Sequence, residues 1–276
     1  MFKKLLFFVL VIFSQRINGQ NQLNFEFDFA RFNYDSSSVY LEFYYNLKTD
    51  NLQSSTKNPF EVIVNIKMEN TETKAFVLNK NYKITDANED SVKKNFTGVF
   101  GFVIPRGKYN LVVKSYDSKN PDLKKTINEV VTIVPYTDYH FAVSDIQLAT
   151  NIIKDGDANS IFTKNSLEVI PNPSMLYSNQ SPVLFFYTEL YNLKPEPAEG
   201  DFNLIKEVYN SAGKQVIKSS KLIKHGPSSI VEIGTVNLSK HPSDTYNLAL
   251  SFVDTKTNKS FISSKRFFLY NPAVKE

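Results

Sequence analysis

The chain has 276 residues, of which 42% are hydrophobic and 22% charged, a composition typical of globular proteins with room for about two domains. It contains no cysteine and only 9 glycines, which excludes disulfide-stabilised and collagen-like classes. The formal net charge is +4, but Lys3, Lys4 and Arg16 lie in a predicted leader. The mature chain is therefore close to neutral, and we expect no binding to nucleic acid.

The N-terminus has the pattern of a secretory signal peptide. Lys3 and Lys4 precede nine apolar residues, 5–13, and a polar stretch that ends at Gly19. Nine helical residues cover about 14 Å, whereas a bilayer span needs about 20 residues. We predict a signal peptide at 1–19, cleaved after Gly19, and export to the periplasm, the cell surface or the medium. No later run reaches 18 apolar residues, so the mature chain is not expected to span a membrane.

After the leader, apolar and polar residues alternate in short runs, which is typical of half-buried strands. Residues 141–153 fit either a strand or a short helix, and 154–164 read as a loop. Turn-forming residues such as those at 105–107 and 210–213 separate the runs. The alternating runs cover 23–29, 39–47, 62–68, 109–113 and 129–134 and, in the second half, 183–193, 204–209, 216–223 and 246–252.

This pattern predicts an all-β fold with two tandem Ig-like or fibronectin-III-like antiparallel β-sandwiches after the signal peptide. We place domain 1 at 20–136 and domain 2 at 137–276, with the boundary near 135–138, where the strand that ends at Val134 stops. The absence of cysteine and tryptophan excludes the antibody-type core.

Two short matches indicate that one unit occurs twice. Tyr-Asn-Leu-Lys at 45–48 recurs at 191–194, and Tyr-Asn-Leu at 109–111 recurs at 246–248 in the same order. A proline lies four residues before both Tyr109 and Tyr246. We interpret these two residues as tyrosine corners, in which the hydroxyl is hydrogen-bonded to upstream backbone at the start of strand F. The alternative is an ordinary tyrosine at a strand entry.

Signatures of catalysis are missing. The three histidines, His140, His225 and His241, form no i, i+4 pair, and neither a GxSxG elbow nor a cysteine nucleophile exists. We predict that the chain is not an enzyme, with no catalytic residues and no cofactor. Carboxylates distant in sequence could still meet in space, so a hydrolase is the third hypothesis.

One loop partly resembles a calcium site. Asp155, Asp157 and Asn159 alternate as in the first half of a calcium loop. Ser160 and Ser166 occupy the positions that call for Gly and Glu, so we interpret the loop as a polar turn and predict no metal site.

Tyr40, Tyr44 and Tyr116 lie on the less apolar faces of their predicted strands. They could form an exposed platform for sugars or for a partner protein, or they could pack in the core.

Several stretches are similar to a known family. Residues 27–32 with 39–45, 144–149, 167–174 and 185–193 resemble, in this order, the N-terminal part of GWxTD domain-containing proteins, exported bacterial proteins typical of Bacteroidota and relatives. The resemblance runs from about residue 25 to 270 and favours a strand at 144–149. The chain has no tryptophan and therefore lacks the GWxTD motif, which lies further toward the C-terminus in the family. It is a truncated copy, a fragment of a longer reading frame, or a relative without that domain.

The resemblance implies export, tandem sandwiches and a non-catalytic role, and it supplies no catalytic residues. Our first hypothesis is an exported interaction or scaffold module whose sheet edges and loops contact an unknown protein partner. The alternative is a carbohydrate-binding module that uses exposed tyrosines.

Overall fold

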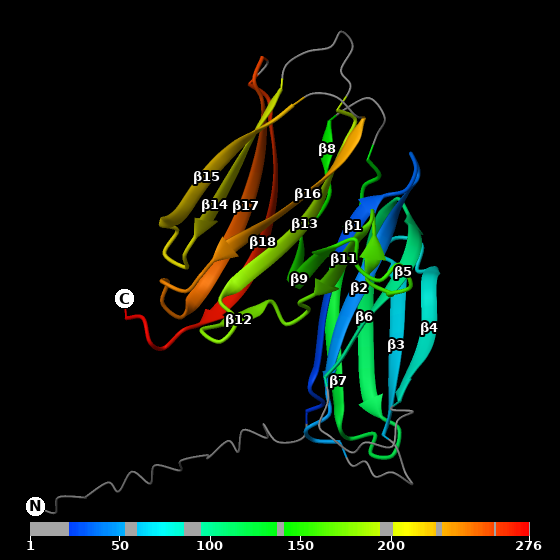
Figure 1. The fold of residues 1–276 in the computed structure, drawn as a ribbon. Coiled ribbons are helices and arrows are strands. Elements are labelled where there is room, and N and C mark those ends of the chain that lie inside the picture. Colours follow the sequence, from blue (N-terminus) through cyan, green and yellow to red (C-terminus); the bar gives the residue numbers. More distant parts are fainter. Residues whose placement is uncertain are drawn as a thin grey trace, which may run out of the picture.

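The computed structural model describes residues 22–52, 60–85, 95–136, 141–193, 201–224, 228–256 and 258–275. This part of the chain is all-β, which confirms the predicted fold class (Figure 1). None of its elements is a helix that could cross a bilayer. The predicted signal peptide at 1–19 and part of the predicted boundary at 135–138 lie outside the described residues.

The first sandwich packs a three-stranded sheet against a four-stranded sheet, and all neighbouring strands are antiparallel. Its core lies between the sheets and is built from alternate residues of the central strands, such as Leu41 and Phe43 against Val64 and Ile66. The sheet orders are β1 (Phe25–Asn33), β2 (Ser38–Lys48), β5 (Asn95–Pro105) and β4 (Phe76–Thr85), β3 (Glu61–Asn70), β6 (Gly107–Asp117), β7 (Lys124–Ile133).

The second sandwich repeats this plan with extra short strands. β8 (Ala142–Val143) pairs with β13, and β12 is parallel to β18. The sheet orders are β10 (Thr163–Lys164), β11 (Leu167–Pro171), β9 (Gln147–Lys154), β13 (Val183–Tyr191), β16 (Ser229–Asn237) and β12 (Leu176–Ser178), β18 (Ser260–Tyr270), β17 (Asp244–Asp254), β14 (Phe202–Tyr209), β15 (Gln215–Ile223).

The second repeated motif falls at equivalent places of the two sandwiches, in β6 and β17. The first does not: Tyr45 of β2 packs against the core of its own sandwich, whereas Tyr191, the last residue of β13, is hydrogen-bonded to Asn33 of the other sandwich. Tyr109 Oη donates to the carbonyl of Pro105 at 3.0 Å, and Tyr246 Oη donates to that of Pro242 at 2.8 Å. Both rings are buried, so each buried hydroxyl is satisfied by backbone four residues upstream, as in a tyrosine corner.

The region that fitted either a strand or a helix is extended. β8 and β9 cover most of 142–154, and the segment 144–146 between them is not a strand. Asn172, just after β11, donates its backbone N–H to the Leu148 carbonyl of β9 at 2.9 Å. The predicted loop at 154–164 is confined to 155–162, because β9 extends to Lys154 and β10 covers 163–164.

Aromatic rings cover the glycines of two edge strands. Gly98 of β5 lies opposite Tyr45 of β2, and Gly234 of β16 lies opposite Phe186 of β13. A Cβ atom on either glycine would run into the facing ring. The rings therefore occupy the space that a side chain would fill, which offsets the weak intrinsic strand preference of glycine.

We expect Gly234→Ala to lower the free energy of unfolding by about 2 kcal/mol, because the new Cβ would lie 2.5 Å from Cζ of Phe186, a ring that is 1% exposed and has no room to move. In the control Gly101→Ala, the new Cβ meets the end of the Tyr40 ring, which is 36% exposed and can rotate outward. Urea unfolding of both variants checks this. If both variants lose the same free energy of unfolding, the burial of the facing ring does not determine how much the new Cβ destabilises the fold.

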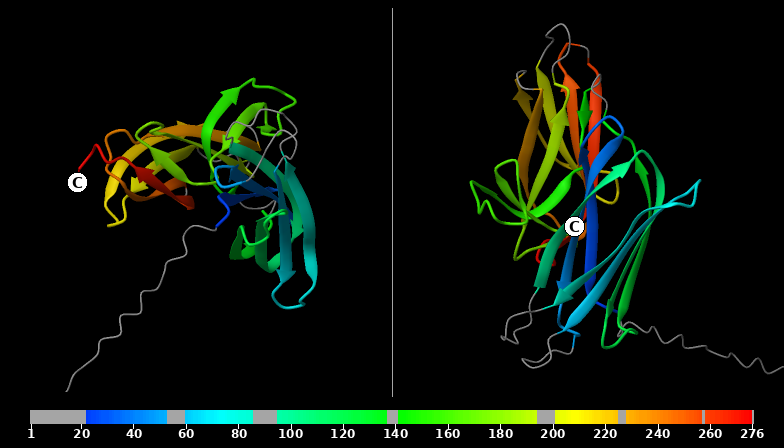
Figure 2. Two further views of the ribbon diagram at one scale, coloured as in Figure 1. Left: turned by 90° about the horizontal axis from the view of Figure 1, so that it is seen from below. Right: turned by 90° about the vertical axis from the view of Figure 1, so that its right-hand side faces the viewer.

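The outer faces of equivalent sheets meet between the sandwiches. Ala30, Phe32 and Tyr44 of β1 and β2 form one buried cluster with Ala149, Val169 and Tyr187 of β9, β11 and β13. In Figure 1, β1 and β2 lie beside β9, β11 and β13, and the further views agree (Figure 2). β1 therefore buries Phe25 in its own sandwich and Phe32 against the other one.

Candidate functional site

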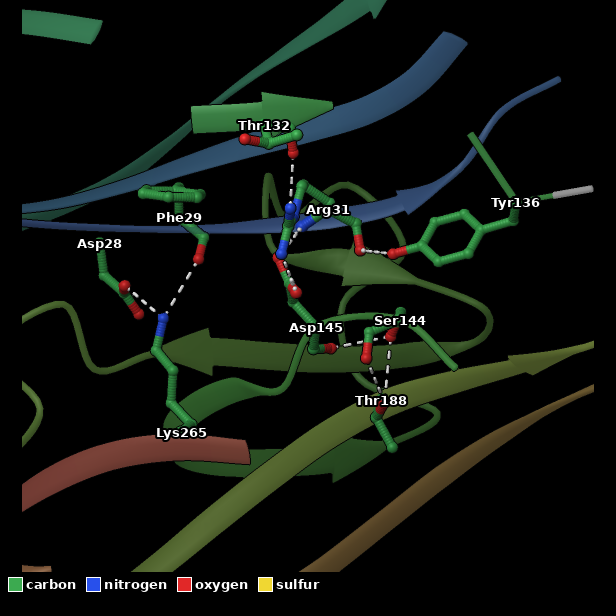
Figure 3. A network of polar contacts seen from close by, with 9 residues as sticks. All are labelled: Asp28, Phe29, Arg31, Thr132, Tyr136, Ser144, Asp145, Thr188 and Lys265. Atoms are coloured by element: carbon green, nitrogen blue, oxygen red, sulfur yellow. Dashed lines mark hydrogen bonds and ion pairs between the residues drawn. The ribbon is translucent and has the colours of Figure 1, made fainter. Parts of the chain in front are cut away.

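The contact between the sandwiches, which we call the junction, carries three ion pairs. The first joins β18 to β1: Lys265 Nζ lies 2.5 Å from Asp28 Oδ1 and donates to the Phe29 carbonyl at 3.2 Å (Figure 3). Burial raises the pKa of Asp28, and Lys265 opposes this effect. The Lys265 ammonium lies against this buried carboxyl group and favours its charged form.

The second pair is bidentate. Arg31 Nε and Nη2 donate to Asp145 Oδ2 and Oδ1, both at 2.8 Å, and Arg31 Nη1 donates to the Thr132 carbonyl at 2.7 Å (Figure 3). The backbone N of Arg31 also donates to Asp145 Oδ2, at 3.0 Å. The hydrogen bond to Asp145 raises the pKa of Arg31. Tyr136 Oη donates to the Arg31 carbonyl at 3.1 Å, which ties the residue that follows the end of the first sandwich to the same strand.

The third pair lies in an aromatic cage. Lys164 Nζ lies 2.6 Å from Glu42 Oε2, and Tyr44 Oη donates to the same oxygen at 2.5 Å. The ammonium also lies 4.0 Å from the ring centroid of Phe32 and 4.5 Å from that of Tyr187. Burial lowers the pKa of Lys164, although Glu42 favours its charged form. The two rings and Glu42 replace water around the cation.

A chain of tyrosine hydroxyls extends this arrangement. Tyr191 Oη accepts from the backbone N of Asn33 at 2.9 Å and donates to Glu189 Oε2 at 2.7 Å. Tyr187 Oη donates to Glu189 Oε1 at 2.5 Å and accepts from Asn165 Nδ2 at 2.6 Å. Burial is the main cause that raises the pKa of Tyr187 and of Tyr191. These phenols therefore remain neutral hydrogen-bonding groups.

Two hollows border the junction. One, of about 30 Å³, lies between Glu42, Lys164 and Gln147, and the Gln147 Oε1 atom there is buried without a hydrogen-bond partner. This space suits one or two water molecules. The other is a crevice of about 470 Å³ lined by Arg31, Asp145, Tyr136, Phe141 and other residues around them, a size that suits a small ligand.

The ionic groups at the junction compensate one another, which limits the chemistry they can perform. Arg31 is bonded to Asp145, Lys164 to Glu42 and Lys265 to Asp28. A catalytic acid or base needs access to a substrate proton, and a nucleophilic lysine needs a free amine. The arrangement is therefore suited to fixing two bodies against each other.

Of the two interpretations of Tyr40, Tyr44 and Tyr116, the shared platform does not fit the structure. Tyr40 is 36% exposed, but Tyr44 is only 2% exposed because the second sandwich covers it and Glu42 binds its hydroxyl. Tyr116 belongs to β6 in the other sheet of the first sandwich, so it cannot share a surface with Tyr40. The alternation along β2 identified the face of Tyr44 correctly but gave no sign that a second domain buries it.

The calcium-like loop uses its oxygens locally. Asp157 Oδ1 accepts from the backbone N of Asn159 at 2.9 Å. In the described part of the chain, no three His, Asp or Glu side chains are grouped so that they could hold a metal ion. His140 and His225 lie outside the described residues, and burial lowers the pKa of His241.

The sequence analysis did not select the junction residues Arg31, Glu42, Asp145, Lys164 and Lys265. Arg31 and Asp145 are 114 positions apart, so no local spacing links them. One available signal was that Asp28 and Glu42 stand on strands whose other face is strongly apolar.

Comparison with known proteins adds little. No family model and no curated protein matches the chain. The similar solved structures include a Parabacteroides merdae beta-glucuronidase, with 10% identity over 86% of this chain and a TM-score of 0.27. A calcium-binding mutant of Bacteroides uniformis beta-glucuronidase 2 has 11% identity over 90% of this chain and a TM-score of 0.30. The chain spans 28% and 32% of the lengths of these enzymes.

Proposed function

We propose that the chain is an exported, non-catalytic scaffold or interaction module in which the two sandwiches act as one rigid body. The observation that carries this proposal is the junction, where three ion pairs and an apolar cluster join strands of both sandwiches. A flexible linker between independent domains would need none of these contacts. A rigid pair presents loops and sheet edges of both sandwiches at fixed distances, which suits recognition of a protein partner.

Export and family membership belong to the same proposal. The leader pattern at 1–19 supports export, and the resemblance to the N-terminal part of GWxTD domain-containing proteins supports an exported bacterial module without catalysis. The carbohydrate-binding alternative has less support, because Tyr44 is buried and Tyr40 and Tyr116 lie in different sheets.

Partner capture from the native cell tests the function. A tagged full-length chain, cross-linked in intact cells with an amine-reactive reagent, should yield a partner in constant stoichiometry. Asp145→Ala, which loosens the junction, should reduce the yield, whereas Lys83→Ala, which removes an exposed pair with Glu61, should not. Circular dichroism must show that both variants are folded. Absence of a stoichiometric partner, together with glycan hydrolysis by the purified chain, would overturn the proposal.

We expect the exported protein to begin at Gln20, because signal peptidase cleaves after the apolar segment of the leader and its polar end at Gly19. Mass spectrometry of the protein purified from its native cell, with fractionation of periplasm and medium, measures this. A cytoplasmic protein that still begins at Met1 would contradict export.

A further inference from the structure

The long edge strands of the two sandwiches differ in how they are protected. A sheet edge with free backbone groups invites pairing with another chain, and charged residues that point inward are a common defence. Four long edge strands have such residues opposite core positions of their neighbours. They are Lys80 in β4, Glu129 in β7, Lys221 in β15 and Glu232 in β16.

Lys221 and Glu232 also form an ion pair across the open side of the second sandwich, at 2.8 Å. Side chains of the second sandwich cover the edge of β1. The backbone N of Asn33 donates to Tyr191 Oη, and the backbone N of Arg31 donates to Asp145 Oδ2. Each of these edges is therefore either charged or covered.

β5 is the exception among the long edge strands of the described chain. It has no charged residue from Asn95 to Pro105, and its core-facing residues are aromatic, aliphatic or glycine. Phe100 and Phe102 are only partly buried, and both pack against Tyr82 of β4 at the open side of the sandwich.

The free backbone groups of β5 follow from its register. Arg31 N is bonded to Asp145, so Arg31 points its backbone groups away from β2. Leu41 lies opposite Arg31 in β2, so its backbone N–H and C=O groups point toward β5. Phe102 lies opposite Leu41, and its own backbone groups point toward β2. The groups that point to the open edge are those of Thr97, Val99, Gly101 and Val103, and no described residue is hydrogen-bonded to them.

We propose that β5 is a self-association edge, where β5 of a second copy of this chain adds in antiparallel orientation. The free N–H and C=O groups recur about every 6.8 Å along the strand, a spacing that another strand matches. Two copies of β5 do not repel each other, because the strand carries no charge. When two identical strands pair about a two-fold axis, each covers the free edge of the other, so the assembly stops at a dimer. This dimer is independent of the partner protein proposed above.

Sedimentation velocity of the mature chain, residues 20–276, tests the edge between about 1 and about 100 µM. The wild type should shift from monomer to dimer with concentration. Val103→Pro removes an outward N–H without touching the ladder to β2 and should weaken the dimer at least about tenfold. Val103→Ala keeps that N–H and should dimerise as the wild type does, which separates the backbone contact from the loss of a side chain that is 43% exposed.

Hydrogen exchange gives an independent measurement. The outward amides of Thr97, Val99 and Gly101 should exchange more slowly at the higher concentration in the wild type and not in Val103→Pro. A wild type that remains monomeric at about 100 µM, or a dimer that Val103→Pro does not weaken, would overturn the proposal. Neither result bears on partner capture in the native cell, so this proposal and the proposed function fail separately.

Discussion

Replacing Lys164 by methionine is expected to lower the free energy of unfolding by about 3 kcal/mol, because Glu42, which is 9% exposed, then loses the nitrogen that donates to it at 2.6 Å, a donor that even an uncharged lysine keeps. The double variant Glu42→Gln with Lys164→Met should regain most of that loss, since it removes both charges while Tyr44 can still donate to the new amide oxygen. Urea unfolding of the wild type, both single variants and the double variant measures the coupling. Additive losses would mean that the pair is not coupled.

The same lysine gives a pH dependence with a definite sign. Burial lowers the pKa of Lys164 from its usual 10.5, so between the folded and the unfolded pKa the unfolded chain binds more protons. Stability therefore rises with pH across that window and levels off above about 10.5. Lys164→Met should lack this rise, and the difference between the two stability curves isolates the contribution of Lys164. Curves that run parallel would show that the charge of Lys164 is not penalised in the folded state.

Replacing Asp145 by alanine is expected to cost about 2 to 3 kcal/mol and to loosen the two sandwiches. The change removes two bonds to the guanidinium of Arg31 and one to its backbone N. We place the loss below that of a fully buried pair because the Arg31 and Asp145 side chains are 34% and 24% exposed. Urea unfolding measures the free energy of unfolding, and small-angle scattering measures whether the two sandwiches move apart.

Glu61→Ala is the matched control for Asp145→Ala. It breaks a pair in which Lys83 is 57% and Glu61 34% exposed, so the loss of stability should be too small to measure by urea unfolding and the scattering should not change. If Asp145→Ala behaves like this control, the ion pair does not hold the sandwiches together.

The strands that could be predicted are those with one face in a sandwich core. β3 has an apolar residue at every second position, at Val62, Val64 and Ile66, and its neighbour β6 does the same. β4 was missed because an edge strand with Lys80 facing inward breaks the alternation. β5 was missed because Gly98 and Gly101 lower its strand preference, and only the register with β2 shows that tyrosine rings cover them.

The junction could not be predicted, because it joins the outer faces of two sheets, and the sequence pattern of these faces is that of a surface exposed to water. Along β1, Asp28 alternates with phenylalanines and resembles the polar side of a surface strand. The structure buries it beneath Lys265, 237 positions away. Local periodicity says which residues share a face, but it does not say whether water or another domain covers that face.

The meeting of equivalent faces at the junction bears on how the chain evolved. β1, β2 and β5 of one copy hold the same places in their sheet as β9, β13 and β16 of the other, and the outer faces of these two sheets lie against each other. Like surfaces in contact are the hallmark of a two-fold homodimer. Fusion of two genes for such an ancestral dimer would join the subunits permanently, after which one half could gain β10 and β11 and place Lys164 opposite Glu42 of the other half. Once diverged, neither half could be lost without exposing Phe32 or Tyr187 of the survivor, so selection would keep both.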